Sequence, residues 1–224
     1  MTGEPGESGG STGAEAPAWG AFESFLGDRL VPPDDALDGA LAASAAAGLP
    51  AVNVSANQGR LLDLLVRISG ARRVLELGTL GGYSTIWLAR ALPAGGRLIT
   101  VDADERHVAV ARATVARAGL QDVVDLRVGP AEELVAQLAE AGGPLFDLAF
   151  VDVDESVNAD LFAPVRRLTR PGGIVVVGAA DLVRGTRRLF AAIAGEPGVT
   201  ATAVQAVGAS GRGGLVIARI DDGP

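Results

Sequence analysis

The stretch that most constrains the fold is residues 74–85 (VLELGTLGGYST), where a short, mostly apolar segment passes into three glycines within five residues. Apolar residues at helical spacing begin directly after Ser84. Because glycine lets the backbone turn sharply and lie close to a ligand, the stretch predicts a buried strand, a tight turn and a helix start. A second apolar strand, about 20 residues further on, is predicted to end at Asp102, whose carboxylate suits the two hydroxyls of a ribose. The pattern predicts a nucleotide-type cofactor site.

The glycine spacing distinguishes between classes of cofactor. A dinucleotide fingerprint has the form G-x-G-x-x-G, and Leu80 stands where its second glycine would be. That change, together with the carboxylate of Glu76 just before the turn, disfavours a doubly charged pyrophosphate. Both features are compatible with a ligand that carries a cationic centre, such as S-adenosylmethionine. The alternative is a plain strand, turn and helix that binds no cofactor.

Downstream of residue 71, predicted strands and helices alternate, which is typical of a parallel sheet with helices on both faces. The predicted strands lie near residues 73–77, 97–102, 123–128, 146–152 and 173–178, and the helices near residues 83–92, 104–118, 131–141, 157–169 and 181–194. Turns are predicted at the glycine-rich breaks, including residues 171–173. Two final strands, residues 200–207 and 214–220, are joined by a glycine-rich turn. The class is therefore α/β.

The N-terminal part divides into a tail and three helices. Residues 1–17 contain almost no large apolar side chain, so we expect them to be disordered. Residues 18–70 predict three helices, interrupted by prolines at 32–33 and by the break at 48–50, with Ser55 capping the third. The residues of that helix expected to face inward are Leu61, Leu62, Leu65, Val66 and Ile68. We expect residues 18–70 to form a cap over the cofactor side of a core at 71–224, within one domain at 18–224.

Residues 71–220 resemble the cation-dependent O-methyltransferases, the family of the catechol and caffeoyl-coenzyme A enzymes. The motifs that carry the resemblance are residues 76–79 with 82–84, Asp102, residues 129–131 and residues 146–152, and it extends upstream through 30–33 to 58–59. It implies a Rossmann-like class I methyltransferase with a mostly parallel seven-stranded sheet and an antiparallel C-terminal hairpin. It also implies S-adenosylmethionine as the cofactor and a phenol or hydroxylated metabolite as the methyl acceptor.

The resemblance assigns the cofactor contacts. The predicted cofactor-binding residues are Val52, Val54, Glu76, Gly78, Ser84, Asp102, Ala131, Glu132 and Asp152. Gly78 and Ser84 are expected along the methionine part and Asp102 at the ribose. The pair at 131–132 is expected to flank the adenine, the two valines close over from the cap, and Asp152 lies near the transferred methyl group.

Two departures from the family fall on its catalytic centre. Asp152 matches the family's first metal ligand, but Glu155 stands where the family has the lysine that acts as base. The other two ligands, an Asp-Asn pair after the fifth strand, are replaced by Gly178 and Ala179, which have no donor atoms in their side chains. Asp181 could substitute only if the backbone bulged. We therefore predict methyl transfer without a tightly bound divalent metal and with Asp152 as the catalytic base. Loose binding of a cation by the carboxylates of Asp152, Asp154 and Glu155 stays open.

Composition excludes several classes of function. A net charge of -8 argues against a nucleic-acid partner, and no run of about 18 apolar residues predicts a membrane span. The chain contains no cysteine and no secretory pattern at its start, which favours the cytoplasm. All 19 basic residues are arginine, so a lysine base is excluded. The apolar helix with Trp19, Phe22 and Phe25, together with the resemblance, suggests a homodimer.

Two single residues and two rival functions complete the interpretation. His107, the only histidine, is interpreted as part of a solvated helix face, and Tyr83, the only tyrosine, as packing beside the cofactor loop. One rival function is a non-catalytic relative that acts by binding a partner. The other is a dinucleotide-dependent oxidoreductase.

Overall fold

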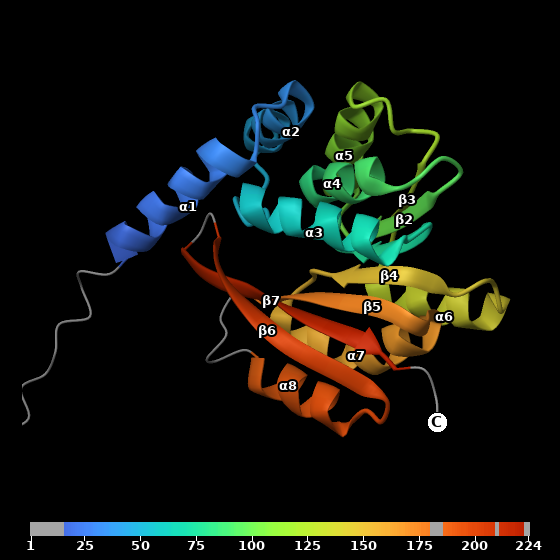
Figure 1. Cartoon of the computed structure of the whole chain (residues 1–224). Helices are drawn as coiled ribbons and strands as arrows, with labels where there is room; N and C mark the ends of the chain where they lie inside the picture. The colour runs from blue at the N-terminus through green and yellow to red at the C-terminus, as the bar shows by residue number, and fades with distance from the viewer. Residues whose placement is uncertain (1–15, 180–185, 209–210, 222–224) are drawn as a thin grey trace, which may run out of the picture.

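The computed structural model describes residues 16–179, 186–208 and 211–221. One sheet has the strand order β3-β2-β1-β4-β5-β7-β6 (Figure 1). Its strands are β1 Arg73–Leu77, β2 Arg97–Asp102, β3 Val124–Val128, β4 Phe146–Val151, β5 Thr169–Ala179, β6 Val199–Gly208 and β7 Gly211–Ile220. Strands β1 to β5 pair in parallel, whereas β7 is antiparallel to both β5 and β6. The predicted Rossmann-like sheet with a C-terminal antiparallel hairpin is confirmed.

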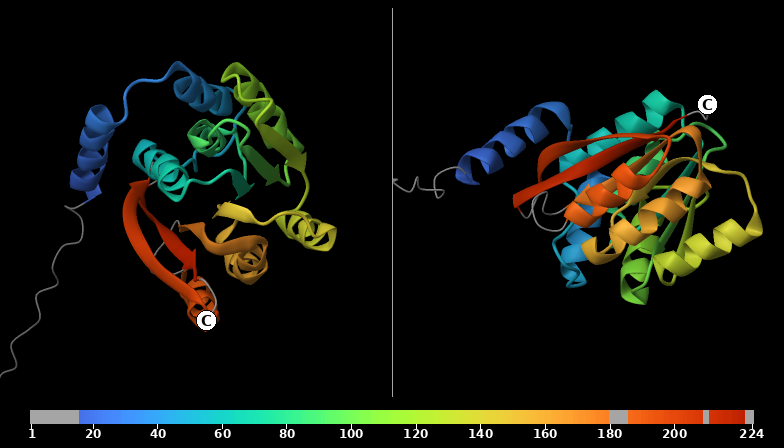
Figure 2. Two further views of the ribbon diagram at one scale, coloured as in Figure 1. Left: turned by 45° about the vertical axis from the view of Figure 1, so that its right-hand side comes forward. Right: turned by 90° about the horizontal axis from the view of Figure 1, so that it is seen from below.

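Helices cover both faces of the sheet (Figures 1 and 2). They are α1 Ala16–Leu30, α2 Asp35–Ala46, α3 Ala56–Ser69, α4 Tyr83–Ala91, α5 Glu105–Arg117, α6 Ala131–Ala141, α7 Glu155–Leu168 and α8 Thr186–Gly195. Side chains alternate along β1, so that Val74 packs with α3, α4 and α5, whereas Leu75 and Leu77 pack with α6, α7 and α8. Two hydrophobic clusters, one on each face, therefore hold the layers together.

The strand order places the carboxyl ends of β1 and β4 at the switch point of the sheet. From β1 the chain continues to β2 on one side, and β4 pairs with β1 on the other. In open α/β sheets the crevice outside this point is where ligands bind. The fold thus brings the loops after β1, β2, β3 and β4 to one edge.

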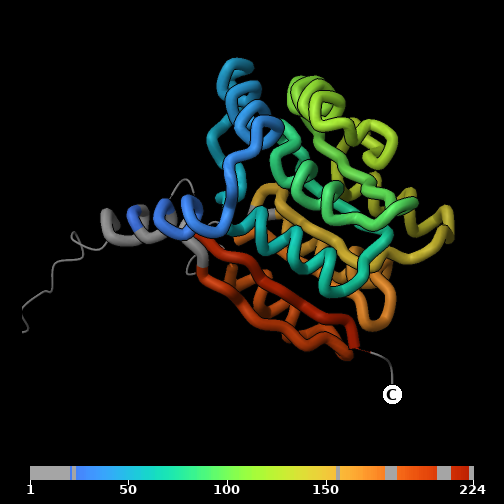
Figure 3. Tube along the Cα trace, turned by 45° about the horizontal axis from the view of Figure 1, so that its top comes forward, coloured from blue at the N-terminus to red at the C-terminus, as the bar shows by residue number. Residues whose placement is uncertain are grey.

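The N-terminal helices differ from the expected cap. Helix α3 lies on the sheet between α4 and the β6–β7 hairpin (Figure 3). Its Leu62 and Val66 are fully buried in the cluster that also contains Phe150. The inward orientation expected for Ile68 is wrong, because it is 79% exposed. At 3.6 residues per turn, Ile68 lies on the opposite side of the helix from Val66.

Among the described residues of the N-terminal part, those that line the crevice belong to the loop at residues 50–54 between α2 and α3. This loop is fixed by a capping box, in which Ser55 Oγ accepts from the Gln58 amide at 3.2 Å and Gln58 Oε1 accepts from the Ser55 amide at 2.8 Å. The predicted cap at Ser55 is present. Of the predicted disordered tail, residues 1–15 lie outside the described residues, and α1 begins at Ala16.

Two further boundaries differ from the sequence prediction. The turn expected at residues 171–173 is an irregularity inside β5, where the pairing with β4 jumps from Thr169 to Ile174. The start of the helix expected at 181–194 lies outside the described residues, and α8 begins at Thr186. Within the described ranges, no helix has the length and apolar character needed to cross a bilayer.

Candidate functional site

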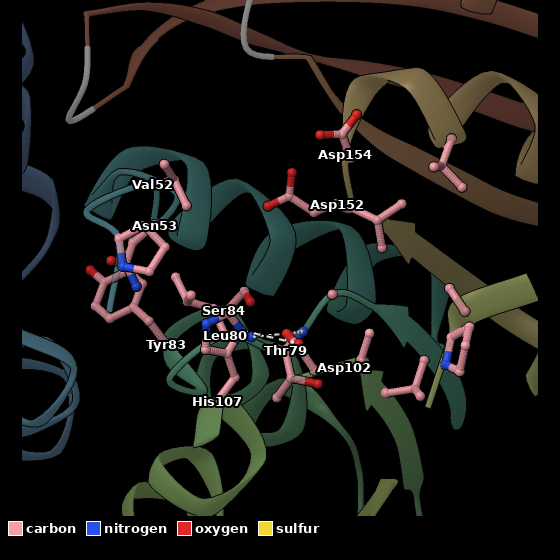
Figure 4. Close-up of a pocket in the computed structure, with 18 of the residues that line it drawn as sticks. Val52, Asn53, Thr79, Leu80, Tyr83, Ser84, Asp102, His107, Asp152 and Asp154 are labelled. Atoms are coloured by element: carbon pink, nitrogen blue, oxygen red, sulfur yellow. Dashed lines mark hydrogen bonds and ion pairs between the residues drawn. The ribbon is translucent and has the colours of Figure 1, made fainter. Parts of the chain in front are cut away.

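A cavity of about 710 Å³ opens at the carboxyl edge of the sheet. Its walls come from the loops after β1, β2, β3 and β4 and from the loop at residues 50–54. In Figure 4, Asp102 and His107 lie on one side of the cavity, and Asp152 and Asp154 lie on the other. Eight of the nine predicted cofactor-binding residues line this cavity, and the exception is Glu76. The fold therefore gathers residues that are 102 positions apart in the sequence, from Val52 to Asp154.

The glycine turn requires backbone conformations that other residues rarely adopt. Gly78 and Gly82 have φ angles of 94° and 86°. A Cβ atom at Gly78 would lie 2.2 Å from the carbonyl oxygen of Asp152, so the turn packs directly on the end of β4. Among the described residues, Leu80 is the only non-glycine residue with positive φ, at 47°. The loop therefore needs external support at Leu80.

The carboxylate of Asp102 supplies that support. Its Oδ2 accepts from the amides of Leu80 at 2.8 Å and Thr79 at 3.2 Å. Its Oδ1 accepts from the amide of Asp104 at 3.0 Å and lies 3.0 Å from His107 Nδ1. Asp102 is thus both a wall of the cavity and the anchor of the glycine turn.

The interpretation of His107 as part of a solvated helix face is wrong. Its side chain is 19% exposed, lines the cavity and contacts Asp102. Helix α5 is capped by Asp104, whose side chain accepts from the Arg106 amide, and His107 therefore falls in the first helical turn, next to the end of β2. The location of His107 at the cavity could have been predicted from its place in the sequence, because the first helical turn after a parallel strand borders the carboxyl edge of the sheet.

Glu76 lies beneath the site and not in it. The alternation along β1 turns its side chain toward α4, where Oε1 accepts from Ser84 Oγ and Oε2 from Thr85 Oγ1, both at 2.6 Å. The side chain is fully buried, and this burial raises its pKa to about 7. The expected direct contact of Glu76 with the cofactor is not supported by this geometry. Glu76 instead holds Ser84, which does line the cavity, at the start of α4.

Asp152 is half-buried at the end of β4 and faces the cavity. Burial and the nearby Glu76 carboxylate raise the pKa of Asp152 to about 7. A Cβ atom at Gly178 would lie 2.0 Å from Asp152 Oδ1, so the absence of a side chain at Gly178 leaves the space that this carboxylate fills. The Gly178 carbonyl accepts from Asn158 Nδ2 at 3.1 Å, which fixes the end of β5 against α7.

The residues at this end of the sheet do not fit the divalent metal that the family resemblance implies. A hard cation needs several oxygen ligands, and Gly178 and Ala179 supply none from their side chains. Within the described ranges, no group of three His, Cys, Asp or Glu side chains is placed to hold a metal ion. Asp181, the candidate for a displaced ligand, lies outside the described residues.

Comparison with known proteins gives consistent results. A family model described as O-methyltransferase matches residues 35–186. A catechol O-methyltransferase of Niastella koreensis is 41% identical over 213 residues, covering 88% of this chain and 96% of that protein. A catechol O-methyltransferase of Mycobacterium tuberculosis is 43% identical over 212 residues, covering 88% and 94%. The crystal structure of an O-methyltransferase from Bacillus cereus in complex with SAH has a TM-score of 0.88 and 41% identity, covering 92% of this chain and 100% of that one.

The buried Glu76 carboxyl predicts how stability depends on pH. Because its pKa rises from 4.5 to about 7 on folding, the folded chain holds a proton that the unfolded chain releases. The free energy of unfolding should therefore fall as the pH rises from about 5 to about 8, by about 3 kcal/mol for this group, with Asp152 acting in the same direction. Chemical denaturation of the wild type and of Glu76→Gln across this range measures the effect. The variant should show the flatter profile, and equal slopes would contradict the assignment.

Proposed function

Because this chain belongs to the S-adenosylmethionine-dependent O-methyltransferases, we propose that it methylates a hydroxyl group of a small molecule without a tightly bound divalent metal. The observation that carries the metal-free part is the end of β5, where Gly178 leaves room for the Asp152 carboxylate and supplies no ligand. The two rival functions lose support, because the compared relatives are named as O-methyltransferases.

The proposed cofactor pose follows the cavity walls. The methionine part lies along Gly78 and Ser84, where the turn leaves the backbone accessible. The ribose hydroxyls meet Asp102, the carboxylate at the end of β2 that accepts from two amides of the turn. The adenine lies at the start of α6, beside Ala131 and Glu132. Val52 and Val54 cover the cofactor from the opposite side.

In the proposed chemistry, Asp152 acts as the general base. The acceptor O–H proton moves to the carboxylate, the oxygen lone pair attacks the methyl carbon, and the C–S bond breaks, so that the sulfur of neutral S-adenosylhomocysteine keeps the electron pair. A base whose pKa is about 7 is half ionised at neutral pH, which suits proton transfer there. Alignment of the acceptor oxygen with the methyl group supplies much of the remaining acceleration.

The acceptor is proposed to be a phenol or a hydroxylated metabolite. Two relatives that match almost all of this chain are named catechol O-methyltransferases, which supports an aromatic hydroxyl. The acceptor side of the cavity combines apolar Val153 and Val157 with Asp152, as expected for an aromatic ring that presents a hydroxyl to a base. A nucleic-acid partner stays disfavoured by the net charge, and the cytoplasm stays the predicted location.

A homodimer is also proposed, built on α1 and β6. Helix α1 lies at the periphery of the molecule (Figure 2). Its Phe25 and Leu30 are 51% and 61% exposed. Strand β6 is an edge strand, and its residues 201–205 are all exposed. The side chains of Trp19 and Phe22, which motivated the sequence prediction, lie outside the described residues. Burying these apolar groups together with an open strand edge favours association with a second copy.

Light scattering should give twice the mass of one chain for the wild type at micromolar concentration. Replacing both Phe25 and Leu30 with glutamate should give the mass of one chain, since each carboxylate would be buried without a partner. A single-chain mass for the wild type would overturn the dimer, and α1 would then have to pack against its own domain.

Replacing the base should separate chemistry from cofactor binding. Asp152→Asn keeps the shape of the side chain and removes its basicity, so kcat should fall by about 10²–10⁴, whereas affinity for S-adenosylhomocysteine should change far less. The wild-type kcat should rise with pH through about 7, and the variant should lack this rise. Asp154→Asn, on the same wall, is the matched control and should retain the rise. Full activity of Asp152→Asn would remove Asp152 from the mechanism.

Methyl transfer should survive the removal of divalent cations. The assay uses a panel of phenols and hydroxylated natural products, with and without a chelator, and equal rates are expected because the described residues offer no ligand set. A cation-dependent catechol O-methyltransferase in the same chelator is the control. Activity that disappears in chelator and returns with magnesium would contradict the metal-free mechanism and would point to Asp181 as a ligand.

A further inference from the structure

The hydrogen bonds at Asp102 are unequal in origin. Three of its four donors are backbone amides, those of Thr79, Leu80 and Asp104. The fourth is the imidazole of His107 at 3.0 Å, which is the only side-chain group among them. Because Asp side chains rotate readily about their last bond, the direction of the carboxylate depends on how many donors hold each oxygen. On Oδ1, His107 is one of only two.

The position of His107 is itself well defined. Its ring lies between two carboxylates, with Nδ1 at 3.0 Å from Asp102 Oδ1 and Nε2 at 3.7 Å from Asp104 Oδ2. Asp104 caps α5, so the residue that starts the helix also borders the imidazole. The ring forms part of the cavity wall next to Asp102, as Figure 4 shows. The imidazole is therefore held in a fixed position in the cavity wall and is mostly shielded from solvent.

We propose that His107 is a positioning residue for recognition of the cofactor ribose, acting through Asp102. The imidazole holds Oδ1 so that the carboxylate edge stays directed at the ribose hydroxyls, and it excludes water from that side of the cavity. Without it, Oδ1 keeps one donor and the carboxylate turns, so the ribose hydroxyls lose the orientation of the carboxylate edge that they need. The inference rests on the ribose contact of Asp102 that forms part of the proposed function.

The test compares two ligands and several variants by isothermal titration. The ligands are S-adenosylhomocysteine and its 2′,3′-dideoxy analogue, which lacks both ribose hydroxyls. His107→Leu removes the donor, and His107→Asn keeps an N–H group near the position of Nδ1. In His107→Leu, affinity for S-adenosylhomocysteine should fall about tenfold, the loss expected for a weakened hydrogen bond to a charged group. Affinity for the analogue should stay unchanged, and His107→Asn should recover most of the loss.

Activity gives a second measurement. In His107→Leu the KM for S-adenosylmethionine should rise, whereas kcat at saturating cofactor should stay close to that of the wild type, because Asp152 and the acceptor side are untouched. Equal losses for both ligands, no loss for either, or an asparagine variant as weak as the leucine variant would each overturn the proposal. His107→Ala is the second donor-free variant. If both donor-free variants fail to fold, the role of His107 is structural and the proposal is also overturned.

The variant Asp102→Asn distinguishes the proposed role of His107 from the ribose contact of Asp102, on which that role rests. Loss of affinity for S-adenosylhomocysteine in Asp102→Asn, with unchanged affinity in His107→Leu, would overturn the role of His107 alone. Unchanged affinity in Asp102→Asn would overturn the ribose contact itself, whatever the histidine variants do.

Discussion

The whole site depends on a carboxylate buried between β1 and α4. Glu76 is fully enclosed, and its two oxygens accept from the hydroxyls of Ser84 and Thr85, the second and third residues of α4. A buried acid without partners would be costly, so these bonds fix how the helix leaves the strand. The glycine turn is therefore held from below by Glu76 and from the side by Asp102. The turn that lines the cavity is therefore held in place by hydrogen bonds from the protein's own side chains.

The part of the site that the sequence predicts well is the part set by local chemistry. The strand, the glycine turn and the helix start follow from composition and spacing, as does the cap at Ser55, and the structure contains each of them. Asp102 and Asp152 end apolar strands, and the topology of a parallel sheet brings such ends together.

The residues whose orientation in the structure differs from the expectation needed information beyond spacing. Glu76 adjoins the turn in sequence, but the period of two along a strand directs it to the other side of the backbone. The orientation of His107 depends on the angle at which α5 leaves β2, which the cap at Asp104 sets. Ile68 shares the apolar character of Val66 but not its face of α3. In each case the sequence shows the chemical type of the side chain, whereas the direction in which the side chain points is determined by the tertiary structure.

The contact between Gly178 and Asp152 also has an evolutionary consequence. An aspartate at 178 would begin to restore the ligand set of metal-dependent relatives, but its Cβ atom would occupy the place where the Asp152 carboxylate now lies. The first substitution on that path would therefore displace the carboxylate proposed as the base before a cation could be held, since Ala179 still lacks a donor. The intermediate would have neither mode of activating its acceptor. If the proposed metal-free mechanism holds, a return to metal-dependent catalysis would have to pass through this inactive intermediate, so the contact between Gly178 and Asp152 would oppose it.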